Sequence, residues 1–223
     1  MHWQDEGFLL SKNNFNENSI IIEVFTSKFG KYSGIVYGGS SRKQKRIFQI
    51  GNKIFLNWNS KGTNNSGYFK VELIKPITPP FFDDKKRISS ILSASSILKI
   101  LLPERENNHK IYESFNKMLI DLKSAHWIKK YIQWELFLIK ELGFEINLSN
   151  YINGRKISKE SILINNKIFK IPRLMTSTNN DEIFIDSEIK EALIFNKNLL
   201  IENFILPNNL KLPMFRNKLE NYY

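Results

Sequence analysis

Three prolines within five residues, Pro76-Ile77-Thr78-Pro79-Pro80, constrain the fold of this 223-residue chain more than any other feature. Proline lacks the backbone N–H that a helix interior or a central strand requires, so neither element continues through this segment. The spacing of apolar residues also changes here, from alternation before the prolines to helical spacing after them. The sequence therefore predicts two domains, residues 1–80 and residues 81–223, with different architectures.

Before the prolines, the chain reads as short strands rich in β-branched and aromatic residues, separated by turn residues. The predicted strands cover residues 6–12, 18–27, 32–37, 53–59 and 68–75. Five strands without a long helix predict a small closed barrel. An OB-fold and an SH3-like barrel both fit this pattern.

Alternation along the strands assigns each side chain to the inside or the outside of the barrel. The side chains predicted to point inward are Ile20, Ile22, Val24, Ile54, Leu56, Trp58, Phe69, Val71 and Leu73. Two adjacent strands then present Lys53, Phe55, Tyr68 and Lys70 outward. Aromatic rings can stack on unpaired bases while ammonium groups contact phosphates, so this face suits single-stranded nucleic acid. The alternative is that the second half of the chain covers Phe55 and Tyr68.

After the prolines, the sequence predicts three amphipathic helices over about residues 88–102, 111–122 and 124–142, forming an antiparallel bundle. Asp83 or Asp84 is expected to cap the first helix, and Gly143 to follow the third. A hairpin around Asn165-Asn166, a loop over 176–182 and a last helical region over 187–205 complete the chain. The predicted fold class is α+β with two domains: a small β-barrel, then a mainly helical domain with a small β-hairpin.

The charge is strongly positive, with 33 Lys+Arg against 22 Asp+Glu and a net charge of +11. Positive charge favours nucleic acid as a partner. However, 26 Lys, 26 Asn and 31 Ile against 7 Arg is the usage of an AT-rich genome, which raises the pI of proteins of every kind. The uneven distribution is more informative, because residues 1–80 hold 11 Lys+Arg against 5 Asp+Glu, and the remaining residues hold 22 against 17.

A basic loop gives the strongest local signal for DNA binding. Arg42, Lys43, Lys45 and Arg46 place four cations in five residues between two predicted strands. Lys12, Lys28 and Lys31 extend the same positive field if the barrel brings these strand ends together. The predicted DNA contacts are Lys28, Lys31, Arg42, Lys43, Lys45, Arg46, Lys53, Phe55, Tyr68 and Lys70. A solvated run of charge is the alternative reading.

The sequence contains no pattern that indicates catalysis. The absence of cysteine excludes disulfides, thiolate nucleophiles, iron–sulfur clusters and cysteine-ligated zinc, and the chain holds only three histidines. No P-loop, GxGxxG, HExxH or GxSxG motif occurs. No apolar run is long enough to span a membrane, and the first residues lack the basic start of a signal peptide. We therefore expect a soluble, cytoplasmic protein, and no residue pattern in it carries a reaction or points to a metal.

Several short motifs follow one another along the chain. They are WxDEGxxL at 3–10, NENS at 16–19, VFTxxxGK at 24–31, GGSSR at 38–42, QIGN at 49–52, VEL at 71–73, WELxLxxELGF at 134–144 and LPxxR at 212–216. Each motif alone is weak, but the ordered set covers essentially the whole chain. It resembles the RecO family of bacterial DNA repair proteins, and most of all its alphaproteobacterial members.

This resemblance implies an OB-fold barrel followed by a helical domain. It also implies binding of single- and double-stranded DNA, annealing of strands coated with single-strand-binding protein (SSB), and loading of RecA together with RecR in the RecF pathway. The expected partners are DNA, RecR and the C-terminal tail of SSB. The resemblance further implies a nucleoid-associated protein that is not an enzyme and needs no metal or cofactor. Many members carry zinc-binding cysteines where this chain has 148–151, and a proline where it has Ile50. The alternative function is a non-catalytic protein–protein adaptor whose basicity reflects genome composition.

Overall fold

The computed structural model describes residues 1–223 except 43, 61–66, 145, 147–160, 178 and 180–181. The chain forms two compact units, Met1–Leu119 and Ile120–Tyr223, and each is described by itself. The first unit holds the strands before the prolines together with the first helix after them and most of the second. The domain boundary predicted at residue 80 stays a prediction, whereas the change of secondary structure at this place is observed.

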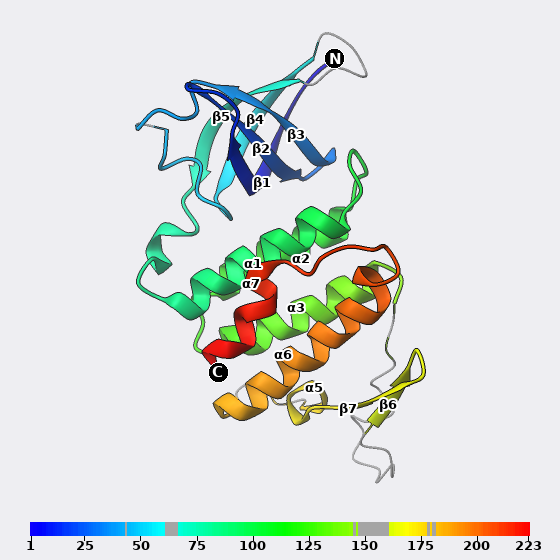
Figure 1. The fold of residues 1–223 in the computed structure, drawn as a ribbon. Helices are drawn as coiled ribbons and strands as arrows, with labels where there is room; N and C mark the ends of the chain where they lie inside the picture. Colours follow the sequence, from blue (N-terminus) through cyan, green and yellow to red (C-terminus); the bar gives the residue numbers. More distant parts are fainter. Residues whose placement is uncertain (43, 61–66, 145, 147–160, 178, 180–181) are drawn as a thin grey trace. The chain divides into compact units, whose positions relative to one another are not determined.

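Five strands of the first unit close into a barrel (Figure 1). They are β1 (His2–Asn14), β2 (Ser19–Thr26), β3 (Gly30–Tyr37), β4 (Lys53–Asn59) and β5 (Tyr68–Lys75). The order around the barrel is β1-β2-β3-β5-β4, and β4 pairs back onto β1. Every pairing is antiparallel except the parallel contact of β3 with β5. This closed ring is OB-like and confirms the first of the two predicted barrels.

The barrel interior contains the side chains that the alternation predicted. Ile22, Val24, Ile54 and Leu56 are completely buried, and Phe69 is buried with them, while Val71 and Leu73 are partly buried. Trp58 packs within this core, with its ring centroid 4.6 Å from that of Phe69. Burial of aromatic and branched side chains on the inner face stabilises a barrel of this size.

Helices α1 (Lys85–Leu101) and α2 (His109–Asp121) follow the barrel, after a 3₁₀ turn at Pro79–Phe81. Asp84 caps α1, its carboxylate accepting a hydrogen bond of 2.9 Å from the Arg87 backbone N–H. Within this unit α1 contacts β1, and Tyr112 of α2 packs against Phe8 at a ring distance of 5.2 Å. These contacts join both helices to the barrel within the compact unit Met1–Leu119.

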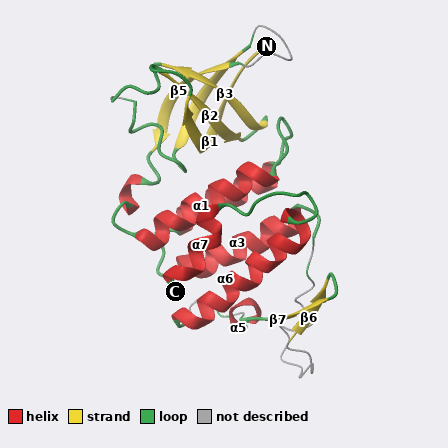
Figure 2. Cartoon of the chain, in the orientation of Figure 1, coloured by secondary structure: helices red, strands yellow, loops and turns green. Residues whose placement is uncertain are grey.

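Where it is described, the second unit is mainly helical and contains one two-stranded sheet (Figure 2). Its elements are α3 (Trp127–Glu141), β6 (Ser161–Ile164), β7 (Lys167–Lys170), α5 (Arg173–Thr176), α6 (Asp186–Leu200), a π-helical turn (Ile201–Ile205), α7 (Met214–Lys218) and a 3₁₀ turn (Leu219–Tyr222). Helices α3 and α6 pack against each other. The predicted hairpin is present, and Asn165 and Asn166 both have positive φ, as a two-residue type I′ turn requires. Three residues of the predicted 176–182 loop lie outside the described residues.

A buried ion cluster ties α7 to α3 within this unit. The Arg216 guanidinium is fully buried, and its Nε lies 2.5 Å from Oε1 of Glu135. Tyr131 donates a hydrogen bond of 2.8 Å to the same carboxylate oxygen, and Glu220 faces the Arg216 Nη1 at 3.4 Å. Arg216 also donates to the Leu193 carbonyl at 2.6 Å. The charges are therefore paired and hydrogen-bonded, as burial requires.

Candidate nucleic-acid interface

The loop between β3 and β4 presents three of the four predicted cations to solvent. Arg42, Lys45 and Arg46 are exposed, and Lys43 lies outside the described residues. Among the residues described, no carboxylate forms an ion pair with any of these three side chains. Their charges therefore remain available to an anionic partner.

Asn52 holds this loop to the barrel. Its side chain is completely buried, and the amide Nδ2 donates to the carbonyls of Arg46 and Ile47, each at 3.1 Å. Its Oδ1 accepts a hydrogen bond of 2.9 Å from the Ile77 N–H. Phe48 extends from the same loop into the barrel core and is 1% exposed. Asn52 and Phe48 thus fix the end of this loop to the barrel, while its described cationic side chains stay exposed.

The outer face of β4 and β5 matches the predicted alternation, but its charges are not uniform. Phe55 is 37% exposed and pairs in register with Glu6 of β1 and with Glu72 of β5. Residues opposite each other on neighbouring strands share one face, so carboxylates flank the Phe55 ring on both sides. Lys70 is exposed and pairs with Asn57, whose neighbour on β1 is Gln4. The Lys70 end of this face therefore suits phosphate better than the Phe55 end.

Tyr68 lies beside a second tyrosine that the alternation argument did not include. Tyr68 is half-buried, and its ring centroid is 5.9 Å from that of Tyr37, which is 65% exposed. The parallel β3–β5 contact at Ile35 and Tyr68 brings these rings together. In the sequence, only the position of Tyr37 at the end of the third predicted strand could have indicated this pair. The two rings provide a surface on which an unpaired base can stack.

The other predicted lysines differ in availability. Lys28 is exposed, and its backbone N–H donates to Asp5 Oδ2 at 2.7 Å. Lys53 forms an ion pair of 2.6 Å with Glu6. Lys31 is buried, and its ammonium group donates to the Lys99 carbonyl at 2.6 Å. Burial lowers the pKa of Lys31, although the charges of Glu23 and Glu104 oppose this effect. Of these three lysines, Lys28 thus has the ammonium group that is most available to a phosphate.

Lys12 lies next to the basic loop, although the two are more than thirty positions apart. It comes from the end of β1 and lines one cavity together with Lys45. Neither Phe55 nor Tyr68 lines this cavity. The barrel therefore brings Lys12 and the loop together, and it places the aromatic face elsewhere.

The described residues show neither a metal site nor a membrane span. Within them, no group of three or more His, Asp or Glu side chains could hold a metal ion. Residues 148–151, where many members of the resembled family have zinc-binding cysteines, lie outside the described residues. No helix among those described is long and apolar enough to cross a membrane.

Comparisons with known proteins identify the family. The family described as "Recombination protein O N terminal" matches residues 1–77, and "Recombination protein O C terminal" matches residues 83–181. Together they cover most of the chain. The gap between the two matches contains the last three residues of the proline segment, Thr78-Pro79-Pro80.

Individual relatives agree with these matches. The DNA repair protein RecO of Wolbachia pipientis subsp. Culex pipiens is 29% identical over 237 residues, which cover 97% of each chain. RecO of Cereibacter sphaeroides is 35% identical over 149 residues, 67% of this chain and 62% of that protein. RecO of Jannaschia sp. is 32% identical over 149 residues, 67% of this chain and 61% of its own. With an OB-like barrel, a helical unit and both family segments in order, this chain belongs to the RecO family of DNA repair and recombination proteins.

Proposed function

We propose that this protein binds and anneals single-stranded DNA and, together with RecR, helps to load RecA onto strands coated with SSB. The observation that carries the proposal is the anchored β3–β4 loop, whose exposed Arg42, Lys45 and Arg46 form no ion pair among the described residues. Membership of a family of DNA repair and recombination proteins supports the same function. Double-stranded DNA is a second ligand, and the nucleoid in the cytoplasm is the place of action.

The mechanism is binding without turnover. Cations neutralise phosphates and release counterions, so the affinity falls steeply as salt rises. The Tyr37–Tyr68 pair stacks on unpaired bases, a contact worth about 1–3 kcal/mol per base. Annealing follows because neutralised strands repel each other less while their base edges stay free to pair. No step of this mechanism requires a nucleotide, a metal or a catalytic side chain.

The loop is tested by replacing Arg42, Lys43, Lys45 and Arg46 together with Ala. Binding of single-stranded DNA should weaken, and the slope of log affinity against log salt should become shallower by about 3, because up to four phosphate contacts are lost. Filter binding across a salt series measures both quantities. An unchanged slope contradicts the assignment of the loop.

The matched control removes the same charge from the second unit. Lys170, Lys190, Lys211 and Lys218 are exposed there and are not among the predicted DNA contacts. Their replacement by Ala should leave the salt slope nearly unchanged. If the unaltered protein shows no binding to single-stranded DNA at low salt, the adaptor alternative replaces the proposed function.

A cavity in the second unit fits the proposed SSB partner. The C-terminal tail of SSB is acidic and ends in a phenylalanine, so its dock needs an apolar groove beside a cation. A cavity of about 370 Å³ between β7 and α6 has apolar lining from Ile168, Phe169, Pro172, Ile194 and Phe195, and its polar lining consists of Lys170, Glu191 and Asn198. We place the SSB tail here, and RecR remains a partner without an assigned surface.

This partner is tested with a fluorescent peptide of the SSB tail. The unaltered protein should bind it at low salt, and Lys170→Glu should weaken binding several-fold, because a like charge then faces the acidic peptide. Lys190→Glu, which makes the same charge change at an exposed position of α6 that does not line the cavity, is the control. If the peptide does not bind at low salt, SSB is not a partner through this tail.

A further inference from the structure

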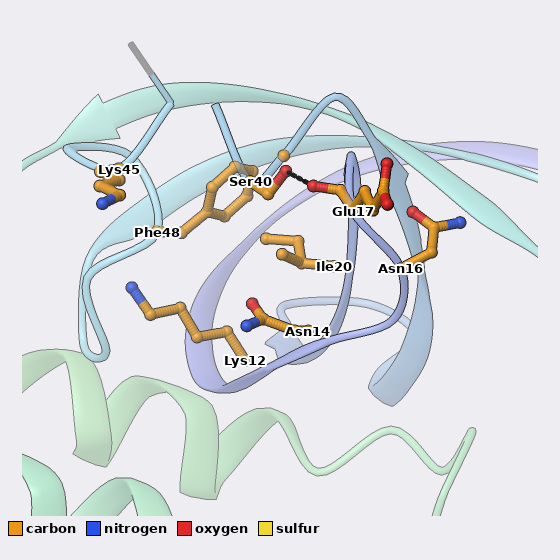
Figure 3. A pocket seen from close by; sticks show the side chains of 9 residues that line it. Lys12, Asn14, Asn16, Glu17, Ile20, Ser40, Lys45 and Phe48 are labelled. Carbon is orange, nitrogen blue, oxygen red and sulfur yellow. Dashed lines mark hydrogen bonds between the residues drawn. The ribbon is translucent and has the colours of Figure 1, made fainter. Parts of the chain in front are cut away.

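A cavity of about 380 Å³ opens at the side of the barrel where β1 ends and the basic loop begins (Figure 3). Its volume is within the range of small-molecule sites. The residues that line it come from β1, the β1–β2 turn, β2 and the loop after β3. They are Lys12, Asn14, Asn16, Glu17, Ile20, Gly39, Ser40, Lys45 and Phe48.

Two ammonium groups lie on the same side of this cavity. Lys12 and Lys45 extend toward it from β1 and from the loop, and their charged ends lie on one side in Figure 3. Among the described residues, neither lysine has a carboxylate partner. Partial burial lowers the pKa of Lys12, and the charge of Lys45 lowers it further. Two like charges held together without a counterion favour an anion that binds both of them.

Among the described residues that line the cavity, the one acidic residue, Glu17, lies on the opposite side. The Glu17 carboxylate is turned away from the two lysines (Figure 3), and the backbone carbonyl of Glu17 accepts a hydrogen bond of 2.8 Å from the Ser40 hydroxyl. This bond joins the β1–β2 turn to the loop after β3. The cavity is therefore polarised, with its positive charge at the Lys12 side.

The deeper wall of the cavity is apolar and closely packed. Ile20 is 4% exposed and Phe48 is 1% exposed, so both belong to the barrel core. A Cβ on Gly39 would lie 2.7 Å from Cγ1 of Ile20, so glycine allows the loop to approach β2 this closely. The amides of Asn14 and Asn16 add donors and acceptors at the rim. An apolar wall, an amide rim and a cationic side suit a nucleotide with an exposed phosphate.

We propose that this cavity binds the terminal phosphate of a DNA strand between Lys12 and Lys45, with the attached nucleotide against the Ile20 wall. A terminal phosphomonoester carries about −1.5 to −2 charge at pH 7 and so matches two ammonium groups. A phosphate inside a strand carries a single charge and matches one. The inference rests on the proposed function, because Lys45 belongs to the loop assigned to DNA, and it adds that the protein distinguishes strand ends from strand interiors.

The test compares short oligothymidylates that carry a phosphate or a hydroxyl at the 5′ end, and a second pair that differs at the 3′ end. Each is labelled at the opposite end and titrated with the full chain at low salt. For one of the two ends, the phosphate should increase affinity roughly tenfold, as expected for two partly exposed ion pairs. Lys12→Gln with Lys45→Gln should abolish this preference and reduce binding of the hydroxyl oligonucleotide much less.

The control removes two charges elsewhere in the same unit. Lys75 and Lys85 are exposed and do not line the cavity, so their replacement by Gln should preserve the preference for the terminal phosphate. Equal affinity of the unaltered protein for the phosphorylated and unphosphorylated oligonucleotides overturns the inference and leaves the proposed function intact. A preference that survives in the Lys12/Lys45 variant overturns the site.

Two further outcomes separate the sources of the phosphate. If thymidine 5′-monophosphate competes as strongly as the phosphorylated oligonucleotide, the cavity takes a free nucleotide and the strand-end inference is wrong. If none of the oligonucleotides binds to the unaltered protein, the proposed function fails and the inference fails with it.

Discussion

Lys28 and Lys31 are three positions apart, yet their ammonium groups have different surroundings. Lys28 is exposed, and only its backbone has a partner in the described residues. Lys31 is buried and donates to the Lys99 carbonyl. Because the folded pKa of Lys31 is lowered, the group disfavours folding at neutral pH, and this cost is relieved as pH rises from the folded pKa toward the unfolded one.

This difference predicts unequal effects on DNA binding. Lys28→Gln should weaken the affinity for single-stranded DNA and reduce the salt slope by up to about 1, as the loss of one phosphate contact does. Lys31→Gln should leave the slope unchanged, because its ammonium is already engaged inside the unit. Parallel salt titrations measure both variants. A larger slope change in the Lys31 variant would show that this ammonium leaves the Lys99 carbonyl to bind phosphate.

Asn52 gives a prediction of stability at the same scale. Asn52→Ala should destabilise the protein by about 2–4 kcal/mol, because it leaves two carbonyls and two buried N–H groups without their side-chain partner. Urea denaturation measures this free energy. Asn57→Ala, at a half-buried position on the outer barrel face, should cost about 0.5 kcal/mol or less. Equal losses in the two variants would contradict the anchoring role of Asn52.

At the scale of elements, the cap of α1 gives a pH-dependent prediction. Burial by itself raises the pKa of Asp84, but hydrogen bonds from the Arg87 backbone and side chain outweigh it and hold that pKa below its usual range. The charged cap therefore contributes fully to the free energy of unfolding above about pH 3.9, the pKa of Asp84 in the unfolded chain. This contribution is lost as pH falls through the pKa of Asp84 in the folded protein.

Asp84→Ala should thus cost about 1 kcal/mol at neutral pH, and its difference from the unaltered protein should shrink at about pH 3. Asp84→Asn should keep the cap across this range, because the amide oxygen accepts the Arg87 N–H without titrating. Chemical denaturation at several pH values gives these comparisons. A constant cost of the Ala variant at all pH values would mean that the carboxylate charge contributes nothing.

The elements themselves were largely predictable. The predicted bounds of β4 and β5 coincide with those observed, and alternation placed Leu56 and Trp58 inside correctly. The hairpin at Asn165-Asn166 was predictable because Asn tolerates positive φ. The first strand was predicted too short, since β1 begins at His2 and its first residues are held by pairing with β4. That pairing is a non-local contact, and a local pattern does not contain it.

At the scale of the whole molecule, the Glu135–Arg216 pair joins positions 81 residues apart inside the second unit. Arg216→Met should destabilise this unit by about 3–5 kcal/mol, because it leaves the Glu135 charge buried and unpaired. Combining it with Glu135→Gln should recover much of the loss, since the buried charge is then removed. Guanidinium denaturation of both variants provides the measurement. A double variant that is less stable than Arg216→Met would show that the carboxylate is needed for other reasons.

The candidate interface was only partly predictable. The basic loop was visible because four cations occur within five residues. Arg42, Lys45 and Arg46 are exposed, and their contact with DNA stays a prediction. The pairing of Lys53 with Glu6, 47 positions away, was not visible, because it follows from the pairing of β1 with β4. The same holds for the Tyr37–Tyr68 pair.

By itself, the sequence determined where strands give way to helices, which side chains fill the barrel, which loop is basic and which family the motifs resemble. These properties depend on composition and on periods of two or 3.6 residues, which act over a few neighbours. Only the tertiary structure decided which cations are available: Lys31 is buried, Lys53 is paired, and Lys12 lies beside Lys45. The physical reason is that an ammonium group's neighbours are set by barrel closure and strand register, which join distant parts of the chain.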